Sequence, residues 1–124
     1  MYELRTYRDW VSDKSLVSFS VVVKETDLHI RARRDLTAAA LAATQRYRAD
    51  LESYIKSHPI FLTTLKPFEV ELNAPPIVKE MADATREAGV GPMAAVAGAI
   101  AERVGKELLP YSDEVIVENG GDIF

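Results

Sequence analysis

The residues best placed to contact a ligand lie near the end of the sequence, in Asn119, Gly120, Gly121 and Asp122. The apolar run that precedes them, residues 115–117, is typical of a strand. Glycines allow positive φ and a close backbone approach, while Asn and Asp place an amide and a carboxylate beside exposed N–H groups. The pattern indicates either a contact to a nucleotide or flavin or an ordinary hairpin turn, and the spacing alone favours the hairpin.

A second glycine segment, with candidate binding residues Gly89, Gly91, Pro92 and Met93, stands before an alanine-rich run. Free N–H groups and the helix dipole at a helix N-terminus attract anions. The segment is not a Walker loop, because the Lys-Ser/Thr pair is absent. A plain turn between two helices, ended by a glycine, is the favoured interpretation.

Charged residues offer two weaker candidates. A basic group comprises His29, Arg31, Arg33 and Arg34, with Arg5 and Arg8 as further members, and an acidic group comprises Asp113, Glu114, Glu118 and Asp122. Arginine binds phosphate or carboxylate in a bidentate manner, and Mg²⁺ favours carboxylates beside a phosphate. Solvated surface is the favoured interpretation of both groups. No histidine pair has metal-ligand spacing, so we predict no metal site and no identifiable catalytic set.

Period-two alternation predicts the strands that would carry these residues. Tyr2–Trp10 alternates as an edge strand, and residues 17–23 place β-branched side chains on one face. Residues 28–32 alternate in the same way after a polar connection at 24–27. The last two runs predict a β-hairpin with one buried face.

Helical spacing predicts a long helix after the hairpin, capped by Asp35 and ended near Ser57 or His58 by Pro59. Its apolar stripe comprises Leu36, Ala40, Ala43, Tyr47, Leu51 and Tyr54. Residues 59–75 have an irregular pattern, with an apolar patch at 60–62 and a short candidate strand at 68–72.

Two shorter helices are expected in the second half of the chain. Pro76 suits the first turn of one, which reaches about Ala88 with Ile77, Met81 and Ala84 inward. The other covers residues 93–109, and its small apolar first half predicts a buried helix. Strands grouped apart from helices indicate an α+β fold, an antiparallel sheet with helices packed on one face, formed by residues 1–124 as a single domain or half-domain.

Composition narrows the class of protein. The chain is 48% hydrophobic with a net charge of −4, which fits one globular core and argues against nucleic-acid binding. No apolar run approaches the ~20 residues of a membrane span, and the first residues lack a leader pattern. We therefore expect a cytoplasmic protein that contacts neither nucleic acid nor membrane.

Several segments together resemble an uncharacterised family related to the ApbE-type flavin transferases. The strongest are the Gly-Val-Gly-Pro-Met segment with its alanine-rich continuation, residues 88–102, and the final strand with its glycine turn, residues 115–123. Residues 23–28, 58–65 and 74–78 also match that pattern. The likeness spans nearly the whole chain.

This resemblance implies a tunnelling-fold-like unit that forms the N-terminal half of a two-part protein. It implies FAD or FMN as cofactor, with the 119–122 turn and the 89–101 stretch beside the flavin, and Mg²⁺ only where a second half is present. The alanine-rich run at 94–101 stands where the transferases carry a lysine, and their metal ligands lie mostly in the second half. We therefore expect a flavin- or nucleotide-binding protein that needs that half for activity. The half could be a second copy of itself, a separate chain, or a piece lost by proteolysis or truncation. The alternative is a non-catalytic structural or assembly module.

Overall fold

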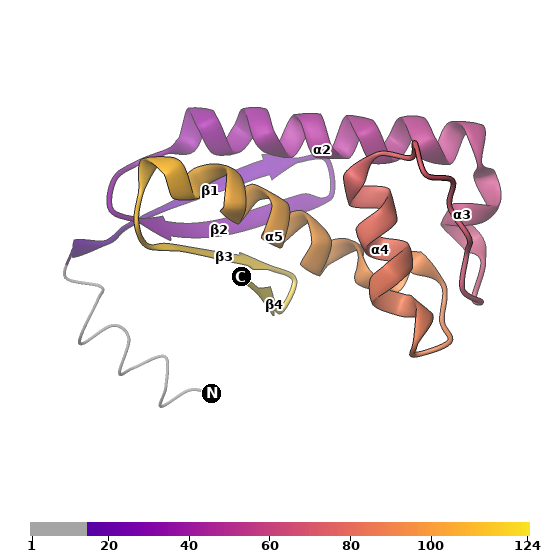
Figure 1. Cartoon of the computed structure of the whole chain (residues 1–124). Helices are drawn as coiled ribbons and strands as arrows, with labels where there is room; N and C mark the ends of the chain where they lie inside the picture. Colours follow the sequence, from indigo (N-terminus) through magenta and orange to yellow (C-terminus); the bar gives the residue numbers. More distant parts are fainter. Residues whose placement is uncertain (1–14) are drawn as a thin grey trace.

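The computed structural model describes residues 15–124. The strand expected at Tyr2–Trp10, with Arg5 and Arg8, lies outside these residues. The described part runs from the hairpin β1 (Val17–Val23) and β2 (Thr26–Ala32) through the helices to β3 (Val115–Asn119) and β4 (Asp122–Ile123). Helices follow the hairpin and precede the last strands, so the α+β class is confirmed (Figure 1).

The four strands form one antiparallel sheet in the order β1-β2-β3-β4. Phe19 pairs with Ile30, and Ile30 pairs with Val117 in the next strand. Because side chains alternate across a strand, this register places the apolar residues of all three strands on one face. Leu28, Ile30 and Val117 are almost wholly buried there, which confirms the predicted hairpin and its buried face.

Two long helices, α2 (Thr37–Ser57) and α5 (Val96–Leu108), supply the core that covers this face. The six residues of the predicted α2 stripe are all buried. The Oδ1 of Asp35 accepts the backbone N–H of Thr37 at 2.9 Å, so the expected cap contact forms, although the residue that directly precedes the helix is Leu36. The helix ends at Ser57, just before Pro59, as predicted.

The C-terminal part of α2 extends past the end of the sheet (Figure 1), where α3 (Pro59–Thr63) and α4 (Pro76–Arg86) pack against it. The helix α3 was not expected, because five residues are too few to show a helical period. Its Phe61 is fully buried and meets the rings of Tyr54 and Phe68 edge-on, with centroids 5.2 and 5.3 Å away. The sheet and these helices thus form two adjoining parts of one core.

The strand expected at residues 68–72 is wrong, because this segment has no regular secondary structure. It lies beside α2 and away from the sheet, so it has no strand to pair with. Side chains hold it instead: the Tyr54 hydroxyl donates to Glu71 at 2.7 Å, and Lys79 donates to the carbonyl of Leu72 at 2.8 Å.

The predicted inward face of α4 was partly wrong. Ile77 and Met81 are buried, but Ala84 is exposed, while Ala82 and Thr85 are buried. Thr85 tolerates burial because its hydroxyl donates to the carbonyl of Met81 at 2.8 Å. The expected stop at Gly89 is confirmed: this glycine has φ +72°, and the next N–H donates to Thr85 at 3.3 Å.

The third expected helix is divided into the 3₁₀ turn η2 (Pro92–Ala95), the α-helix α5 and the 3₁₀ turn η3 (Leu109–Tyr111). Its first half was expected to be buried, yet Ala94 is exposed and residues 95–98 are half-buried. Val96 and Ala97 of this stretch line an open hollow, which explains why they are only half-buried.

Candidate functional site

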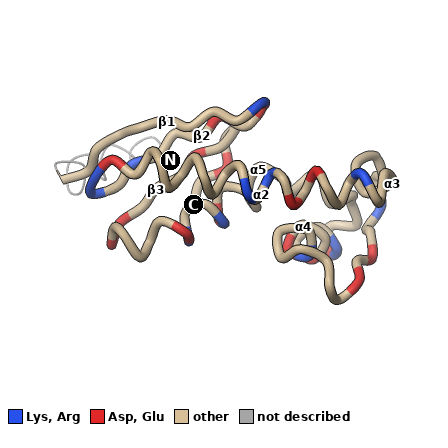
Figure 2. Tube along the Cα trace, turned by 90° about the horizontal axis from the view of Figure 1, so that it is seen from above, with Lys and Arg blue, Asp and Glu red and all other residues tan. Residues whose placement is uncertain are grey.

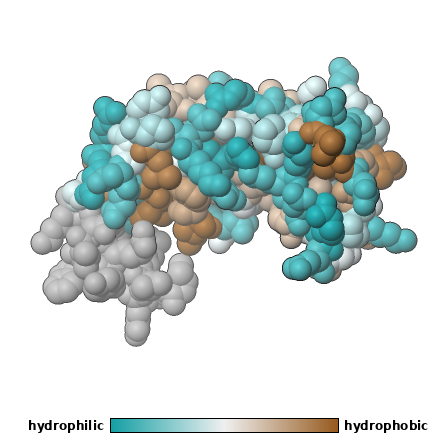
Figure 3. Space-filling model, viewed as in Figure 1, coloured by the Kyte–Doolittle hydropathy of each residue, from teal (hydrophilic) through white to brown (hydrophobic). Residues whose placement is uncertain are grey.

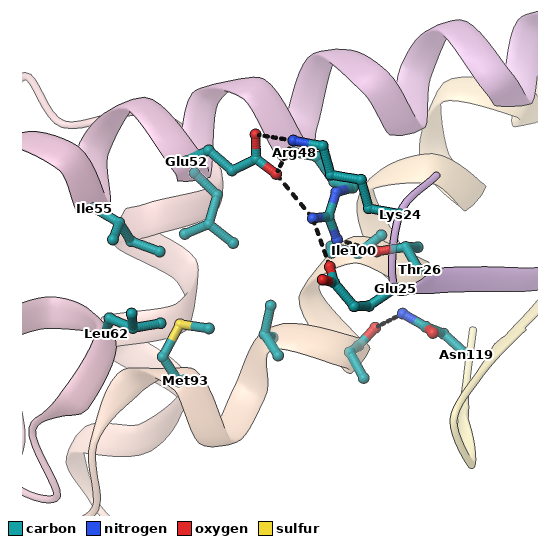
Figure 4. A pocket seen from close by; sticks show the side chains of 13 residues that line it. Lys24, Glu25, Thr26, Arg48, Glu52, Ile55, Leu62, Met93, Ile100 and Asn119 are labelled. Atoms are coloured by element: carbon teal, nitrogen blue, oxygen red, sulfur yellow. Dashed lines mark hydrogen bonds and ion pairs between the residues drawn. The ribbon is translucent and has the colours of Figure 1, made fainter. Parts of the chain in front are cut away.

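The hollow lies where the sheet ends and the α3–α4 part of the molecule begins. It has a volume of about 590 Å³. Its walls come from the β1–β2 turn, α2, α3, η2, α5 and the end of β3, shown from close by in Figure 4. Segments far apart in the sequence therefore meet here only when the domain is folded.

One wall is apolar. Ile55 and Leu62 lie with Met93 on one side of the hollow in Figure 4. Leu51, Val96, Ala97 and Ile100 also line the hollow, and Leu51 and Ile100 are almost fully buried. A flat apolar ring can pack against such a surface, and the thioether of Met93 is suited to an aromatic neighbour.

The opposite wall is charged and hydrogen-bonded. Arg48 on α2 donates from Nη1 to the Thr26 hydroxyl at 2.6 Å and from Nη2 to Glu25 at 3.1 Å and Glu52 at 2.8 Å. The Lys24 ammonium lies 3.1 and 3.2 Å from the two oxygens of the same Glu52 carboxylate. Hydrogen bonds from Lys24 and then Arg48 hold the pKa of Glu52 below its ordinary value, so this carboxylate is ionised at neutral pH.

Lys24 reaches this position through an uncommon backbone conformation. It is a non-glycine residue with φ +54°, at the first position of the two-residue turn between β1 and β2. A bulky residue in the left-handed region is rare, and such residues cluster at functional sites. The turn therefore places a cation at the rim of the hollow at some cost in backbone energy.

The structure brings only two of the eight predicted site residues, Asn119 and Met93, into this hollow. The side-chain amide of Asn119 donates to the carbonyl of Ala97 at 3.0 Å and so ties the end of β3 to the start of α5. The neighbouring Gly120, Gly121 and Asp122 do not line the hollow.

The Asn119–Asp122 segment has the geometry of a hairpin turn. Gly120 and Gly121 have φ +56° and +97°, and Asn119 pairs with Asp122 across β3 and β4. The backbone N–H of Gly121 donates to the Glu118 carboxylate at 2.9 Å. The hairpin interpretation favoured by the spacing is confirmed, and a direct ligand contact by these glycines stays a prediction.

The Gly89–Met93 segment runs from the turn after α4 into the first two residues of η2. Gly91 is buried, and a Cβ added to it would collide with the backbone carbonyl of Thr64. Its missing side chain thus serves the close approach of two backbones. Pro92 is fully buried, which leaves Met93 as the one member of this segment in the hollow.

The basic and acidic groups of the sequence meet at Arg33 and Asp113, and other members contact neighbouring backbone or hydroxyl groups. Arg33 forms an ion pair with Asp113 at 2.8 Å, and this contact lowers the pKa of the Asp113 carboxyl. Arg34 donates to the carbonyl of Tyr111 at 3.2 Å, and His29 lies 3.2 Å from the Ser20 hydroxyl. Figure 2 shows positive and negative residues interspersed along the described part of the chain.

Within residues 15–124 no group of three or more His, Asp or Glu side chains is arranged to hold a metal ion. In the same residues no helix has both the length and the apolar character needed to cross a membrane. The expected cytoplasmic location stays a prediction.

Sequence reasoning missed the charged wall. Arg48 and Glu52 lie off the apolar stripe of α2 and read as solvent-facing, yet the Arg48 side chain is only 16% exposed. Two signals could have pointed to them: their (i, i+4) spacing, and the likeness of residues 23–28 to the ApbE-related family. Neither signal shows that the hairpin turn folds onto this part of α2.

A family model described as AbpE bacteria matches residues 8–124. The chain belongs to this family. Among individual proteins, it is similar to UPF0280 proteins of Methanopyrus kandleri (41% identical over 109 residues), Methanococcus vannielii (44% over 110) and Methanocaldococcus jannaschii (43% over 104). These matches confirm the expected relationship to an uncharacterised ApbE-related family.

The matches to UPF0280 proteins cover most of this chain but less than half of each relative. In the M. kandleri and M. vannielii comparisons they cover 87% of the chain and 44% of the relative. For M. jannaschii the shares are 83% and 42%. The chain therefore corresponds to one part of these longer proteins.

Proposed function

We propose that this chain binds a flavin or a related nucleotide in the hollow between the β1–β2 turn and α5. The observation that carries the proposal is a single hollow with an apolar wall facing a wall that holds Lys24 and Arg48. Small-molecule sites typically have ~300–1,000 Å³ and combine apolar walls with a few polar groups. The volume of about 590 Å³ falls within that range.

The proposed binding mode places the flat ring against Ile55, Leu62 and Met93. These three side chains are half-buried or exposed, so they lose water when a ring covers them, which favours binding. Asn119 and Ala97 lie at the far end of the hollow, where the Asn119 amide keeps that wall in place.

We further propose that a second half, either another copy of this chain or a separate chain, completes the protein, and that Mg²⁺ acts only in that complete form. The greater length of the UPF0280 relatives supports this proposal. An activity such as flavin transfer would belong to the complete protein.

A non-catalytic structural module is the second candidate. It is favoured by one observation, namely that Gly120 and Gly121 close a hairpin and Gly91 fits a backbone crossing. In that case the likeness of the glycine segments to flavin-binding relatives reflects folding alone.

Titration of the full chain with riboflavin, FMN and FAD, followed by flavin fluorescence, tests the first proposal. Ala97→Phe places a ring in the hollow and is expected to abolish binding. Ala84→Phe is the matched control, because Ala84 is exposed on α4 outside the hollow. Absence of flavin binding at high micromolar ligand, with and without Mg²⁺, would favour the structural module.

A further inference from the structure

We propose that Arg48 is the phosphate-binding residue of the hollow. We further propose that Glu25 occupies its guanidinium in the absence of ligand and is displaced when a phosphate group binds. This inference deepens the proposed function, because it names the chemistry that the charged wall recognises. It depends on the geometry of four side chains, Lys24, Glu25, Arg48 and Glu52.

Only some of the N–H donors of the Arg48 guanidinium form hydrogen bonds in the described part of the chain. Its Nε and Nη2 form one edge of the planar group, the edge that a carboxylate or phosphate can bind side-on through two oxygens. Nη2 donates to Glu25 and Glu52, whereas Nε is buried and has no hydrogen-bond partner in residues 15–124. A buried donor without an acceptor is unfavourable, so an anion that reached both nitrogens would relieve that cost.

The two carboxylates on Arg48 differ in how firmly they are held. Glu52 contacts both Arg48 and Lys24. Glu25 makes one ion pair, at 3.1 Å, and its side chain is 87% exposed at the tip of the hairpin. Exposed ion pairs contribute little to stability, so Glu25 can leave Arg48 at small cost while Glu52 stays to orient both cations.

Displacement of Glu25 also changes the charge of the wall. With Glu25 in place, two cations face two carboxylates, and without it Lys24 and Arg48 face Glu52 alone. The resulting positive charge favours a phosphate group, which carries more negative charge than a carboxylate and offers three acceptor oxygens. Since the apolar wall lies across the same hollow, the ligand class is a phosphate ester of a flat, largely apolar group (Figure 4).

The first test measures inorganic pyrophosphate binding to the full chain by calorimetry. Glu25→Gln removes the internal competitor, and we expect it to tighten binding about two- to fivefold, the range that the loss of an exposed ion pair allows. Asp83→Asn is the matched control: it also removes an exposed carboxylate paired with an arginine, on α4 and outside the hollow. The control should leave affinity unchanged.

A second set of variants removes the cations. Arg48→Lys keeps the charge but loses the two-nitrogen edge, and should weaken pyrophosphate binding about tenfold. Arg48 also donates to Thr26, so its replacement can disturb the fold. Lys24→Gln avoids this difficulty, because the Lys24 side chain is 62% exposed. We expect it to weaken pyrophosphate binding about two- to fivefold. Lys106→Gln, which breaks a surface pair on α5, is its control.

The inference is overturned if neither the wild type nor Glu25→Gln binds pyrophosphate, if Glu25→Gln does not tighten binding beyond Asp83→Asn, or if Lys24→Gln behaves like Lys106→Gln. Flavin titrations separate it from the proposed function. Equal binding of riboflavin and FMN, insensitive to Glu25, would keep the flavin site and overturn the phosphate role. Pyrophosphate binding with the expected variant pattern, but without flavin binding, would keep the phosphate role of Arg48 and overturn the flavin site.

Discussion

At the scale of single residues, the glycines before and within α5 have different physical reasons for lacking a side chain. Gly91 is buried where the carbonyl of Thr64 occupies the space of a Cβ. Gly98 has room, because an added Cβ would lie 3.6 Å from the Asp122 carboxyl carbon, an ordinary contact. Sequence spacing made Gly91 a ligand candidate, since a close backbone approach and a ligand approach require the same residue type.

Gly91→Ala is expected to lower the free energy of unfolding by about 1–3 kcal/mol, because the new methyl group forces α3 and η2 apart. Gly98→Ala should be neutral or stabilise by up to about 1 kcal/mol, since alanine favours the helix. Urea unfolding at pH 7 measures both. Equal effects of the two variants would contradict the close approach at Thr64.

The charged wall shows what single-residue patterns leave out. An arginine and a glutamate on the polar side of a helix are normally solvated, and the sequence assigns Arg48 and Glu52 that role. Their partners Lys24 and Glu25 lie on a turn more than twenty residues away, and the register of the hairpin against α2 decides whether they meet. The periodicity of side chains along the sequence does not reveal how the hairpin lies against α2.

At the scale of elements, strong periods predicted β1, β2, α2 and β3, because each buries one continuous face against the common core. The same reasoning failed for α3, which is one short turn, and for residues 68–72, which alternate like a strand but lack a pairing partner. Side chains of two helices hold that segment in place: Tyr54 of α2 donates to Glu71, and Lys79 of α4 donates to the carbonyl of Leu72.

Tyr54→Phe is expected to lower the free energy of unfolding by about 1 kcal/mol, the usual contribution of one hydrogen bond, because the partly buried Glu71 contact is lost. Burial, reinforced by Glu71, raises the pKa of Tyr54 to about 12, so its hydroxyl remains a donor throughout the physiological range. Tyr111→Phe is the control, since no hydrogen bond from the Tyr111 hydroxyl is found within residues 15–124. Chemical denaturation compares the two, and equal losses would contradict a tether at Glu71.

The Glu71 carboxylate should make the attachment of this segment pH-dependent. Its own backbone N–H, then the Tyr54 hydroxyl, hold the pKa of Glu71 below its ordinary value of 4.5. Because the pKa of Glu71 is lowered in the folded state, its carboxylate contributes fully to the free energy of unfolding above the ordinary pKa. That contribution is lost as pH falls through the folded-state pKa. We expect the stability advantage of the wild type over Glu71→Gln to persist at pH 7 and disappear under acid conditions.

Urea unfolding of both proteins between neutral and acid pH checks this expectation. Glu69→Gln is the control, because Glu69 is exposed in the same segment and makes no ion pair in the described part of the chain. His58 also lies 3.2 Å from the Glu71 carboxylate. An advantage that remained at the acid end of the series would therefore contradict the expected loss.

At the scale of the whole molecule, the two faces of the sheet differ. Helices cover one face, while Val22 and Ile123 on the other face are 62% and 56% exposed. Figure 3 shows further apolar surface over α3 and the loop after it, where Leu65 and Leu72 are 85% and 92% exposed. Apolar areas of this kind often mark protein contacts, which agrees with the proposed second half.

We expect the purified chain to exceed its monomer mass of 13.8 kDa in light scattering after size exclusion, if a second copy supplies the proposed second half. Val22→Glu should return it to a monomer by placing a charge on the outer sheet face. Leu65→Glu makes the same change at the other apolar area. A monomer at all concentrations would exclude a second copy of the chain as the source of the second half.

The six elements that enclose the hollow have a practical consequence for finding its ligand. A compound that fits there can bind the native state only, because unfolding disperses all of its contacts. Such a compound raises the melting temperature in proportion to the logarithm of its concentration, and saturation at a hundred times Kd contributes about 2.7 kcal/mol. A thermal-shift library of flavins, nucleotides and sugar phosphates can therefore report the natural occupant without any assay of activity.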